Sequence, residues 1–218
     1  MAKTEPRTAT ATERAYAFTK ERVLDGRFPG GELLSEGDVA TSVGLSRTPV
    51  REAFLRLEAE GFLRLYPKRG ALVVPVSAAE VEDVMETRML VERFAIEKIG
   101  RAPAGLLARL ETEIERQERF AASGDARGFA DSDREFHHLL VVAAGNAVLV
   151  SLHASLRDRQ SRMGLVALAA AEDRMREIRE EHRGLVAALA AGDPNVGELM
   201  AAHLQRSLEL LRGQRPAG

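Results

Sequence analysis

Hydrophobic residues recur with two different spacings along the chain, and the change between them marks its organisation. In residues 12–25, 35–43 and 46–61 the apolar positions return every three to four residues, which predicts three short helices. Residues 62–66 and 71–74 alternate instead, which predicts two β-strands joined by a basic turn. We therefore expect three helices followed by a two-stranded wing.

The turn between the second and third predicted helices is the most informative stretch of this front part. Gly44 permits the turn, and Ser46 is placed to cap the next helix by accepting a hydrogen bond from an early backbone N–H. Pro49 falls in the first helical turn, where its missing N–H has no intrahelical partner. Arg47 and Arg51 are four residues apart and share one face of the helix. Guanidinium groups at the start of the second helix of a helix-turn-helix match guanine edges and phosphates in the DNA major groove.

Beyond Pro75 the whole sequence has the hydrophobic spacing of helices. Ser77 and Glu80 form a capping box that opens the first of them. No alternating, strand-like run follows. The helices predicted from the spacing and its glycine and proline breaks are about 77–99, 104–122, 126–144, 147–169, 172–191 and 194–212.

These elements predict a mainly α protein of two domains. Residues 1–11 are polar and rich in threonine, so we expect a disordered tail. Residues 12–76 are expected to form a winged helix-turn-helix, and residues 77–214 an all-α bundle of about six helices.

Side chains that can bind metal lie on the apolar faces of three predicted bundle helices. A rotation of 100° per residue places Asp133 and His137 together on an inward face and turns His138 outward. His182 and His203 lie at the centres of the apolar faces of the last two helices. A single buried histidine is usually a hydrogen-bonded core residue, but burying four such groups without partners would cost several kcal/mol. Imidazole and carboxylate ligands without thiolate suit zinc first, with nickel and manganese as alternatives.

Arg88 is the other informative residue of the bundle. It lies at the centre of an apolar helix face, where an arginine is costly unless it is paired. Glu92, four residues further on, could supply an intrahelical ion pair. Alternatively, Arg88 binds the carboxylate of a small anionic effector whose other oxygens complete the metal shell. His153 and Arg157 could line the same cavity, or could be core or solvated residues.

Composition narrows the classes of protein that fit. The net charge is −2, yet residues 46–70 hold six basic and three acidic residues, so positive charge gathers on the predicted third helix and wing. The chain has no cysteine, which removes disulfides and thiolate ligands. No apolar run approaches the roughly 20 residues of a membrane span, and no signal-peptide pattern is present, so we expect a cytoplasmic protein.

Several spaced motifs in the front part resemble the winged helix of GntR-superfamily bacterial transcription regulators. The matching residues are Pro29-Gly30, Leu45 to Ala53, Leu57 to Gly61 and Arg69-Gly70. Some members carry a DNA-contacting arginine where this chain has Gly37. On this resemblance the expected DNA contacts are Ser46, Arg47, Thr48, Arg51, Lys68, Arg69 and Gly70.

The bundle resembles the all-helical FCD ligand-sensing domain of the FadR-like branch of the same superfamily. The matching residues are Phe129, Asp133, Phe136, His137, Leu140, Gly145-Asn146, Glu181-His182-Arg183 and Gly192-Asp193. In the metal-binding members an aspartate and three histidines hold a divalent cation at the floor of the effector cavity. The resemblance places that set here at Asp133, His137, His182 and His203, the residues that helical spacing also selects.

Together these patterns predict a DNA-binding transcription regulator, a repressor in most of the family, and not an enzyme. We expect a homodimer that binds a palindromic operator and responds to a small organic acid bound at the metal site. Two alternatives remain open at this stage. One is a DNA-binding protein with a purely structural metal and no effector, and the other is a metal-dependent hydrolase.

Overall fold

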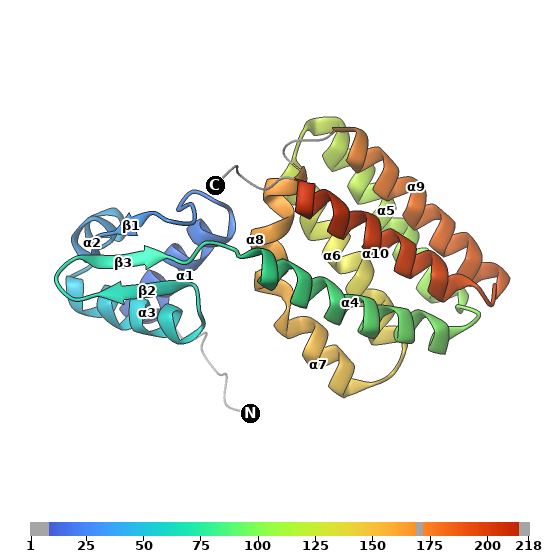
Figure 1. Ribbon diagram of the computed structural model, residues 1–218, viewed down its shortest axis with the longest axis horizontal. Helices are drawn as coiled ribbons and strands as arrows, with labels where there is room; N and C mark the ends of the chain where they lie inside the picture. Colours follow the sequence, from blue (N-terminus) through green and yellow to red (C-terminus); the bar gives the residue numbers. More distant parts are fainter. Residues whose placement is uncertain (1–8, 169–171, 214–218) are drawn as a thin grey trace, which may run out of the picture. The chain divides into compact units, whose positions relative to one another are not determined.

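The computed structural model describes residues 9–168 and 172–213, and its contacts divide the chain between Val76 and Ser77 into two compact units (Figure 1). The predicted tail falls mainly on residues 1–8, outside the described residues. Ala11 instead begins the first helix, and Thr10 caps it. The Thr10 side chain accepts from the backbone N–H of Glu13, and the Glu13 side chain accepts from the backbone N–H of Thr10. This reciprocal cap explains why the helix begins earlier than the apolar spacing indicates.

The first unit packs three helices against a small sheet. Its elements are α1 (Ala11–Leu24), β1 (Leu33–Leu34), α2 (Glu36–Val43), α3 (Arg47–Ala59), β2 (Leu63–Tyr66) and β3 (Gly70–Val73). Val50, Phe54 and Leu57 on α3 are fully buried and form the centre of an apolar core with α1 and the sheet. The side chains on the exposed face of α3 therefore take no part in packing this core.

The sheet has three antiparallel strands in the order β1-β3-β2, one more than the predicted two-stranded wing. Strand β1 is only Leu33–Leu34, too short to show an alternating pattern in the sequence. Its pairing with β3 depends on Gly70, where a Cβ atom would lie 2.2 Å from the Leu34 carbonyl oxygen. Gly70 also has a φ of 107°, so any other residue there is strained.

The second unit is all-helical. Its elements are α4 (Ala78–Ile99), α5 (Ala104–Ser123), α6 (Ala126–Ala143), α7 (Ala147–Ser155), α8 (Arg157–Leu168), α9 (Glu172–Ala191) and α10 (Val196–Gly213). The single helix predicted over 147–169 is wrong, because it breaks at Leu156 into α7 and α8. No glycine or proline marks this break, and the buried side chains of His153 and Leu156 lie at it. The described part of the bundle thus has seven helices where about six were expected.

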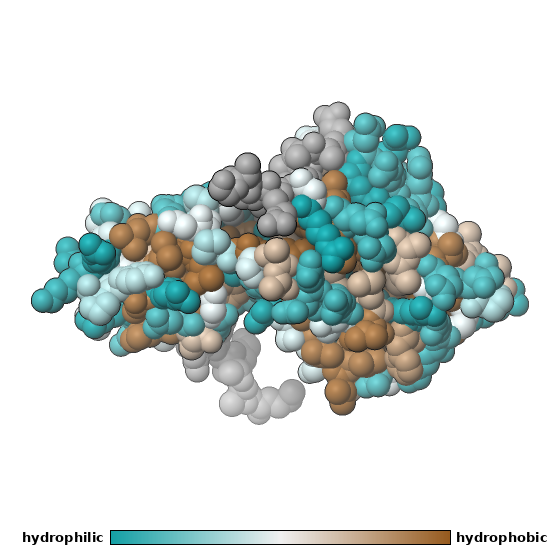
Figure 2. Space-filling view, viewed as in Figure 1, coloured by the Kyte–Doolittle hydropathy of each residue, from teal (hydrophilic) through white to brown (hydrophobic). Residues whose placement is uncertain are grey.

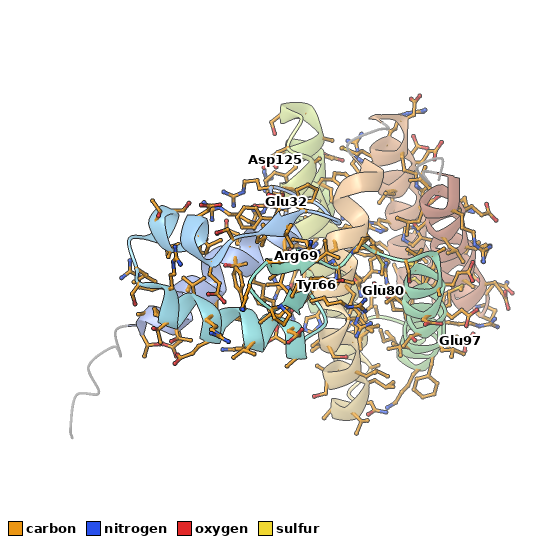
Figure 3. The ribbon with its side chains drawn as sticks, turned by 60° about the vertical axis from the view of Figure 1, so that its left-hand side comes forward. Glu32, Tyr66, Arg69, Glu80, Glu97 and Asp125 are labelled. Atoms are coloured by element: carbon orange, nitrogen blue, oxygen red, sulfur yellow. The ribbon has the colours of Figure 1, made fainter. Side chains whose placement is uncertain are left out.

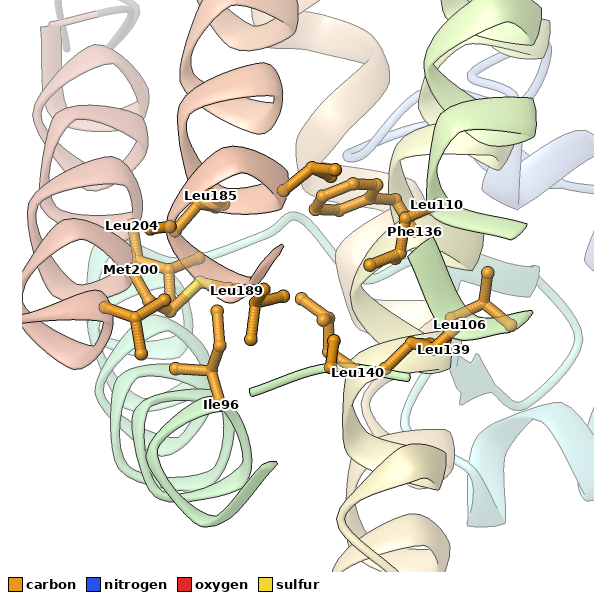
Figure 4. Close-up of a cluster of buried hydrophobic side chains, with 14 of the residues drawn as sticks. Ile96, Leu106, Leu110, Phe136, Leu139, Leu140, Leu185, Leu189, Met200 and Leu204 are labelled. Atoms are coloured by element: carbon orange, nitrogen blue, oxygen red, sulfur yellow. The ribbon is translucent and has the colours of Figure 1, made fainter. Parts of the chain in front are cut away.

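The bundle core collects leucine, methionine and phenylalanine side chains from five helices (Figure 4). Phe136 and Leu140 of α6 face Leu185 and Leu189 of α9, and all four are fully or almost fully buried. This apolar layer lies next to the polar residues of the site described below, since Phe136 and His137 are neighbours on α6. Among the described helices, none is long and apolar enough to cross a membrane.

Candidate metal centre

Three histidines from three helices meet inside the bundle. His137 of α6, His182 of α9 and His203 of α10 each offer a ring nitrogen, and these nitrogens lie within 4.8 Å of one another. The three side chains are almost completely buried. Phe136 stacks on the His182 ring with centroids 3.9 Å apart, which fixes the plane of that ring. The structure therefore brings together the three histidines that helical spacing selected.

Each ring is oriented through the nitrogen that faces away from the cluster. His203 Nδ1 donates to Glu181 Oε2 at 2.5 Å, and His182 Nδ1 donates to Gln117 Oε1 at 3.0 Å. His137 Nδ1 lies 2.5 Å from Glu92 Oε2. Because the Gln117 and Glu181 oxygens accept hydrogen bonds, the Nδ1 atoms of His182 and His203 are assigned the hydrogens, and their Nε2 lone pairs then point inward.

The inward nitrogens are spaced so that one cation could bind them together. His137 Nε2 and His203 Nε2 are 3.1 Å apart, a distance that fits an N–H···N hydrogen bond or two nitrogens bound to one ion. His182 Nε2 is buried with no hydrogen-bond partner in the described part of the chain. Two nitrogens bound to one zinc ion, each at about 2.0–2.1 Å, lie roughly 3.0–3.4 Å apart. The spacing and the orphaned nitrogen both fit a divalent cation.

Asp133 stands at the edge of this cluster. Its Oδ1 lies 3.6 Å from His182 Nε2 and 3.9 Å from His137 Nε2. About a fifth of its side chain is exposed, which leaves it open to the adjoining cavity. The structure thus brings the three histidines together and places the Asp133 carboxylate beside two of them, on the accessible side.

Electrostatics favour the neutral forms of His182 and His203 and the ionised form of Glu181. Burial, together with the neighbouring His203 and His137, lowers the pKa of His182 well below its ordinary value, and burial also lowers the pKa of His203. Burial opposes ionisation of Glu181, yet hydrogen bonds from His203 and Arg174 lower its pKa to about 2. Neutral imidazoles are the form that binds metal.

Arg88 pairs with Glu92 and also faces a cavity. Its Nε donates to Glu92 Oε1 at 2.7 Å, so the intrahelical pair is present. Glu92 is fully buried and also receives a contact from His153 Nε2 at 3.2 Å. Burial opposes ionisation of Glu92, but Arg88 and His137 outweigh it and hold its pKa well below the ordinary value. Arg88 therefore uses its Nε atom for the ion pair, and its Nη2 atom has no partner among the described residues.

A cavity of about 80 Å³ adjoins the histidine cluster. Residues of five helices, α4, α6, α8, α9 and α10, line it. Its polar walls come from Arg88, Asp133, Arg134, Gln160, Arg174, His203 and Ser207, and its apolar walls include Met85 and Ile178. A cavity with one open carboxylate and three arginines is suited to an anionic ligand.

Helical spacing missed most of the surrounding partners. Gln117 and Glu181 orient two of the histidines, and Arg174 holds Glu181 through a 3.1 Å contact. The only hints in the sequence were Glu181 beside His182 and Glu92 four residues after Arg88. His138, predicted to face outward, is partly buried and stacks on His153 with ring centroids 5.8 Å apart.

The first unit carries its basic residues on the surface. Arg47, Thr48 and Arg51 are exposed at the start of α3. Lys68 and Arg69 are exposed in the turn between β2 and β3, where Figure 3 labels Arg69. This arrangement presents a helix start and a wing tip to a partner.

Two details differ from the sequence prediction. Ser46 precedes α3 as predicted, but its side chain makes no capping hydrogen bond, so its hydroxyl is exposed and available. The Arg47 guanidinium lies over α2, with Nη2 3.2 Å from the position that a Cβ atom would take at Gly37. Gly37 therefore gives Arg47 the space in which it lies.

Family models match both units. Residues 11–73 match the family described as bacterial regulatory proteins, gntR family, and residues 83–206 match the FCD domain. The two matched segments together span most of the chain.

Known proteins similar to this chain are regulators. The "Probable D-xylose utilization operon transcriptional repressor" of Paenarthrobacter nicotinovorans is 31% identical over 89% of this chain and 85% of its own length. The gluconate operon transcriptional repressor of Bacillus licheniformis is 26% identical over 94% of this chain and 85% of its own length. A GntR transcriptional regulator from Rhodococcus sp. RHA1 shares the fold, with a TM-score of 0.76 and 24% identity over 95% of this chain and 100% of that chain.

Proposed function

Because this chain belongs to the GntR family of bacterial transcription regulators, with an FCD domain as its second unit, we propose that it is a repressor whose operator affinity is set by a small carboxylate effector bound at a metal ion. The family and the relatives are transcription regulators, not enzymes, so the hydrolase alternative is dropped. The observation that carries the proposal is the convergence of three imidazole Nε2 atoms beside a cavity that contains Arg88.

The DNA-binding surface is proposed to be the start of α3 together with the wing turn. Arg47 and Arg51 would face base edges or phosphates in the major groove, with Ser46 and Thr48 beside them. Lys68 and Arg69 would contact the backbone or minor groove next to it. Gly70 acts through the strand pairing described above and allows the wing to form.

Two such heads are needed to bind a palindrome, so we propose a homodimer formed through the second unit. Leu90 and Phe94 of α4 and Val148 and Leu152 of α7 are exposed apolar side chains, with Leu90 and Val148 each 75% exposed. Apolar surface gathers over α7 and the adjoining part of α4 in Figure 2. Half-sites about 34 Å apart, one helical turn of DNA, would then match the two-fold symmetry.

FCD domains can bind metal, and the residues here fit a divalent ion. His137, His182, His203 and Asp133 would hold it, and zinc suits three imidazoles and a carboxylate best, with nickel and manganese as alternatives. When bound, the ion supplies positive charge that attracts a carboxylate. Arg88 would bind the same carboxylate through its free Nη2 atom, and the apolar layer around Phe136 excludes water from beneath the site.

Effector binding would change operator affinity by tying together helices that line the cavity. Couplings between sites are typically about 1–3 kcal/mol, which corresponds to roughly 5–150-fold in affinity. A change of that size moves an operator from mostly occupied to mostly free at a fixed repressor concentration.

The test combines a thermal-shift screen with a DNA-binding titration. The full-length chain is stripped with a chelator, then screened against small carboxylates with and without Zn²⁺, Ni²⁺ or Mn²⁺. Binding to an operator selected from random duplex DNA is then measured by fluorescence anisotropy, with and without the best acid. We expect an acid that raises the melting temperature only when metal is present and that lowers operator affinity by at least about fivefold.

Matched variants separate the metal from the fold. His182→Ala should lose bound metal, measured by elemental analysis after dialysis, and should therefore lose metal-dependent acid binding as well. His138→Ala should retain the metal. Equal metal content in His182→Ala and the unaltered chain, or operator binding that no acid changes, would overturn the proposal.

A further inference from the structure

Four buried N–H donors without acceptors surround the cavity beside the histidine cluster. They are Arg88 Nη2, Arg134 Nε, Gln160 Nε2 and Arg174 Nε, and none has a hydrogen-bond partner in the described part of the chain. The four residues belong to α4, α6, α8 and α9 and line the cavity from several sides. An unsatisfied buried donor costs about 1–3 kcal/mol, and natural proteins rarely leave several in one place without a partner that satisfies them.

The three arginines among them already have counter-ions. Arg88 pairs with Glu92, Arg134 pairs with Asp131, and Arg174 pairs with Glu181. The protein therefore neutralises one edge of each guanidinium and leaves a further N–H group for something else. These four unused groups are all donors, so a ligand that satisfies them brings acceptors at more than one place in the cavity.

Arg134 and Gln160 also line a second cavity, of about 120 Å³. Its other walls include the carboxylates Asp131 and Glu135 and the side chains of His138, His153 and Arg157. Because the two cavities share these two side chains, Arg134 and Gln160 form a partition between them. Only 7% of the Gln160 surface is exposed, and its amide nitrogen has no partner among the described residues.

The carboxylates near the partition leave two of its donors without acceptors. Asp131 pairs with the Arg134 guanidinium, and Asp131 and Glu135 both line the second cavity. Arg134 Nε and Gln160 Nε2 nevertheless have no acceptor among the described residues. An anionic oxygen beside Arg134 and Gln160 would satisfy both free donors.

We propose that the effector is an acid with at least two anionic groups, one bound by Arg88 at the histidine cluster and the second bound by Arg134 and Gln160 at the partition. This inference rests on the proposed function and extends it from a small carboxylate to a two-headed acid. Arg174 of α9 also lines the cavity, and its free Nε supplies a further donor to the bound acid.

The experiment compares acids that differ only in the second charge. Isothermal titration of the zinc-loaded full-length chain, dialysed free of excess zinc, is carried out with straight-chain dicarboxylates from malonate to adipate and with monocarboxylates of equal carbon number. We expect one chain length at which the diacid binds at least about tenfold more tightly than its monoacid. The monoamide of that diacid, which keeps its size and loses one charge, should bind like the monoacid.

Variants at the partition test where the second charge binds. Gln160→Leu and Arg134→Gln should each bring the diacid-to-monoacid ratio down to about twofold or less, while monoacid affinity stays within about twofold of the unaltered chain. Arg109→Gln, which removes an exposed arginine on α5, should leave the ratio unchanged. Gln160→Leu removes no charge, so it separates loss of a donor from a general change in electrostatics.

The outcomes distinguish this inference from the function on which it rests. If monoacids bind only with zinc and the second charge has no effect at any length, or if the ratio survives in both partition variants, the inference is wrong and the proposed function stands. If no acid of either series binds with or without zinc, both are wrong.

Discussion

In the winged-helix unit the described core is apolar, and Thr19 is the one buried polar side chain found there, bonded to the Ala15 carbonyl of its own helix. The helical unit instead buries arginines, glutamates, two glutamines and four histidines. Its buried groups satisfy one another only in part. The first unit thus keeps its polar chemistry on the surface, and the second places it inside.

In the winged-helix unit, different residues therefore support the fold and the proposed DNA contacts. In the helical unit, the same residues support both the fold and the site. A residue such as Arg51 can be changed without disturbing the packing of Phe54 and Leu57 on the opposite face of α3. In the helical unit Glu92 both neutralises Arg88 and contacts His137, so the same side chain supports the fold and the site. Changes in the two units should therefore have effects of different kinds.

The largest effect is expected from Glu92→Ala. Removing this carboxylate leaves the buried Arg88 without its counter-ion, which should lower the free energy of unfolding by about 3–5 kcal/mol. Hydrogen exchange followed by mass spectrometry on the full, metal-free chain should show the loss in α4 to α10 and none in α1 to α3. The double variant Arg88→Met with Glu92→Leu should recover most of the lost free energy of unfolding. If Glu92→Ala is as stable as the unaltered chain, the buried pair does not link fold and site in the helical unit.

The next effect concerns pH. The pKa values of His182 and His203 lie below the ordinary value in the folded chain, so the unfolded chain binds more protons as the pH falls. Stability of the metal-free helical unit is therefore complete above about pH 7 and should decrease below it by up to about 1.4 kcal/mol per pH unit for each histidine. The first unit has no histidine among residues 1–76 and should show no such decrease. Urea unfolding between pH 8 and pH 5, combined with exchange data, measures both, and stability that rises on acidification would contradict the assignment of neutral rings.

Arg51→Ala should act on DNA binding alone. If Arg51 contacts a base, operator affinity should fall by about 1–3 kcal/mol. The free energy of unfolding should change by less than about 0.5 kcal/mol, because the side chain is exposed. Fluorescence anisotropy and urea unfolding measure the two quantities, with Arg109→Ala as a charge-matched control in the other unit. A loss of stability equal to the loss of affinity would show that surface and core are not separable here.

The smallest effect is expected from Gly37→Ala. The position lies inside α2 without a positive φ, so alanine should raise the free energy of unfolding by about 0.5–1 kcal/mol. The new methyl group would displace the Arg47 guanidinium by a small amount, so operator affinity should change by about twofold. A tenfold loss of affinity would mean that the place of Arg47 over α2 is itself required for DNA binding.

Most of the fold could be predicted from hydrophobic spacing, and its two errors have physical causes. Strand β1 is two residues long, so it exists through its hydrogen bonds to β3 and not through a pattern of its own. The break at Leu156 occurs in sequence that favours helix throughout and reflects how α7 and α8 pack. Both features are set by tertiary contacts.

The site was predictable only in part for a similar reason. Rotation along a helix places Asp133, His137, His182 and His203 on inward faces, because each face is defined by its own helix. The partners of the histidines come from other helices: Gln117 and His182 are separated by 65 residues in the sequence. Spacing within one helix carries no information on which residue of another helix will meet it, so the network around the ligands had to come from the structure.

The imidazole nitrogens that face away from the cluster contact side chains from three different helices, and these side chains differ chemically. Glu92 of α4 and Glu181 of α9 are carboxylates, whereas Gln117 of α5 is a neutral amide. An imidazole that donates to a carboxylate is a more basic ligand than one that donates to an amide. Exchange of glutamine for glutamate at position 117 could thus alter which ion a descendant of this protein prefers while its coordinating side chains remain identical.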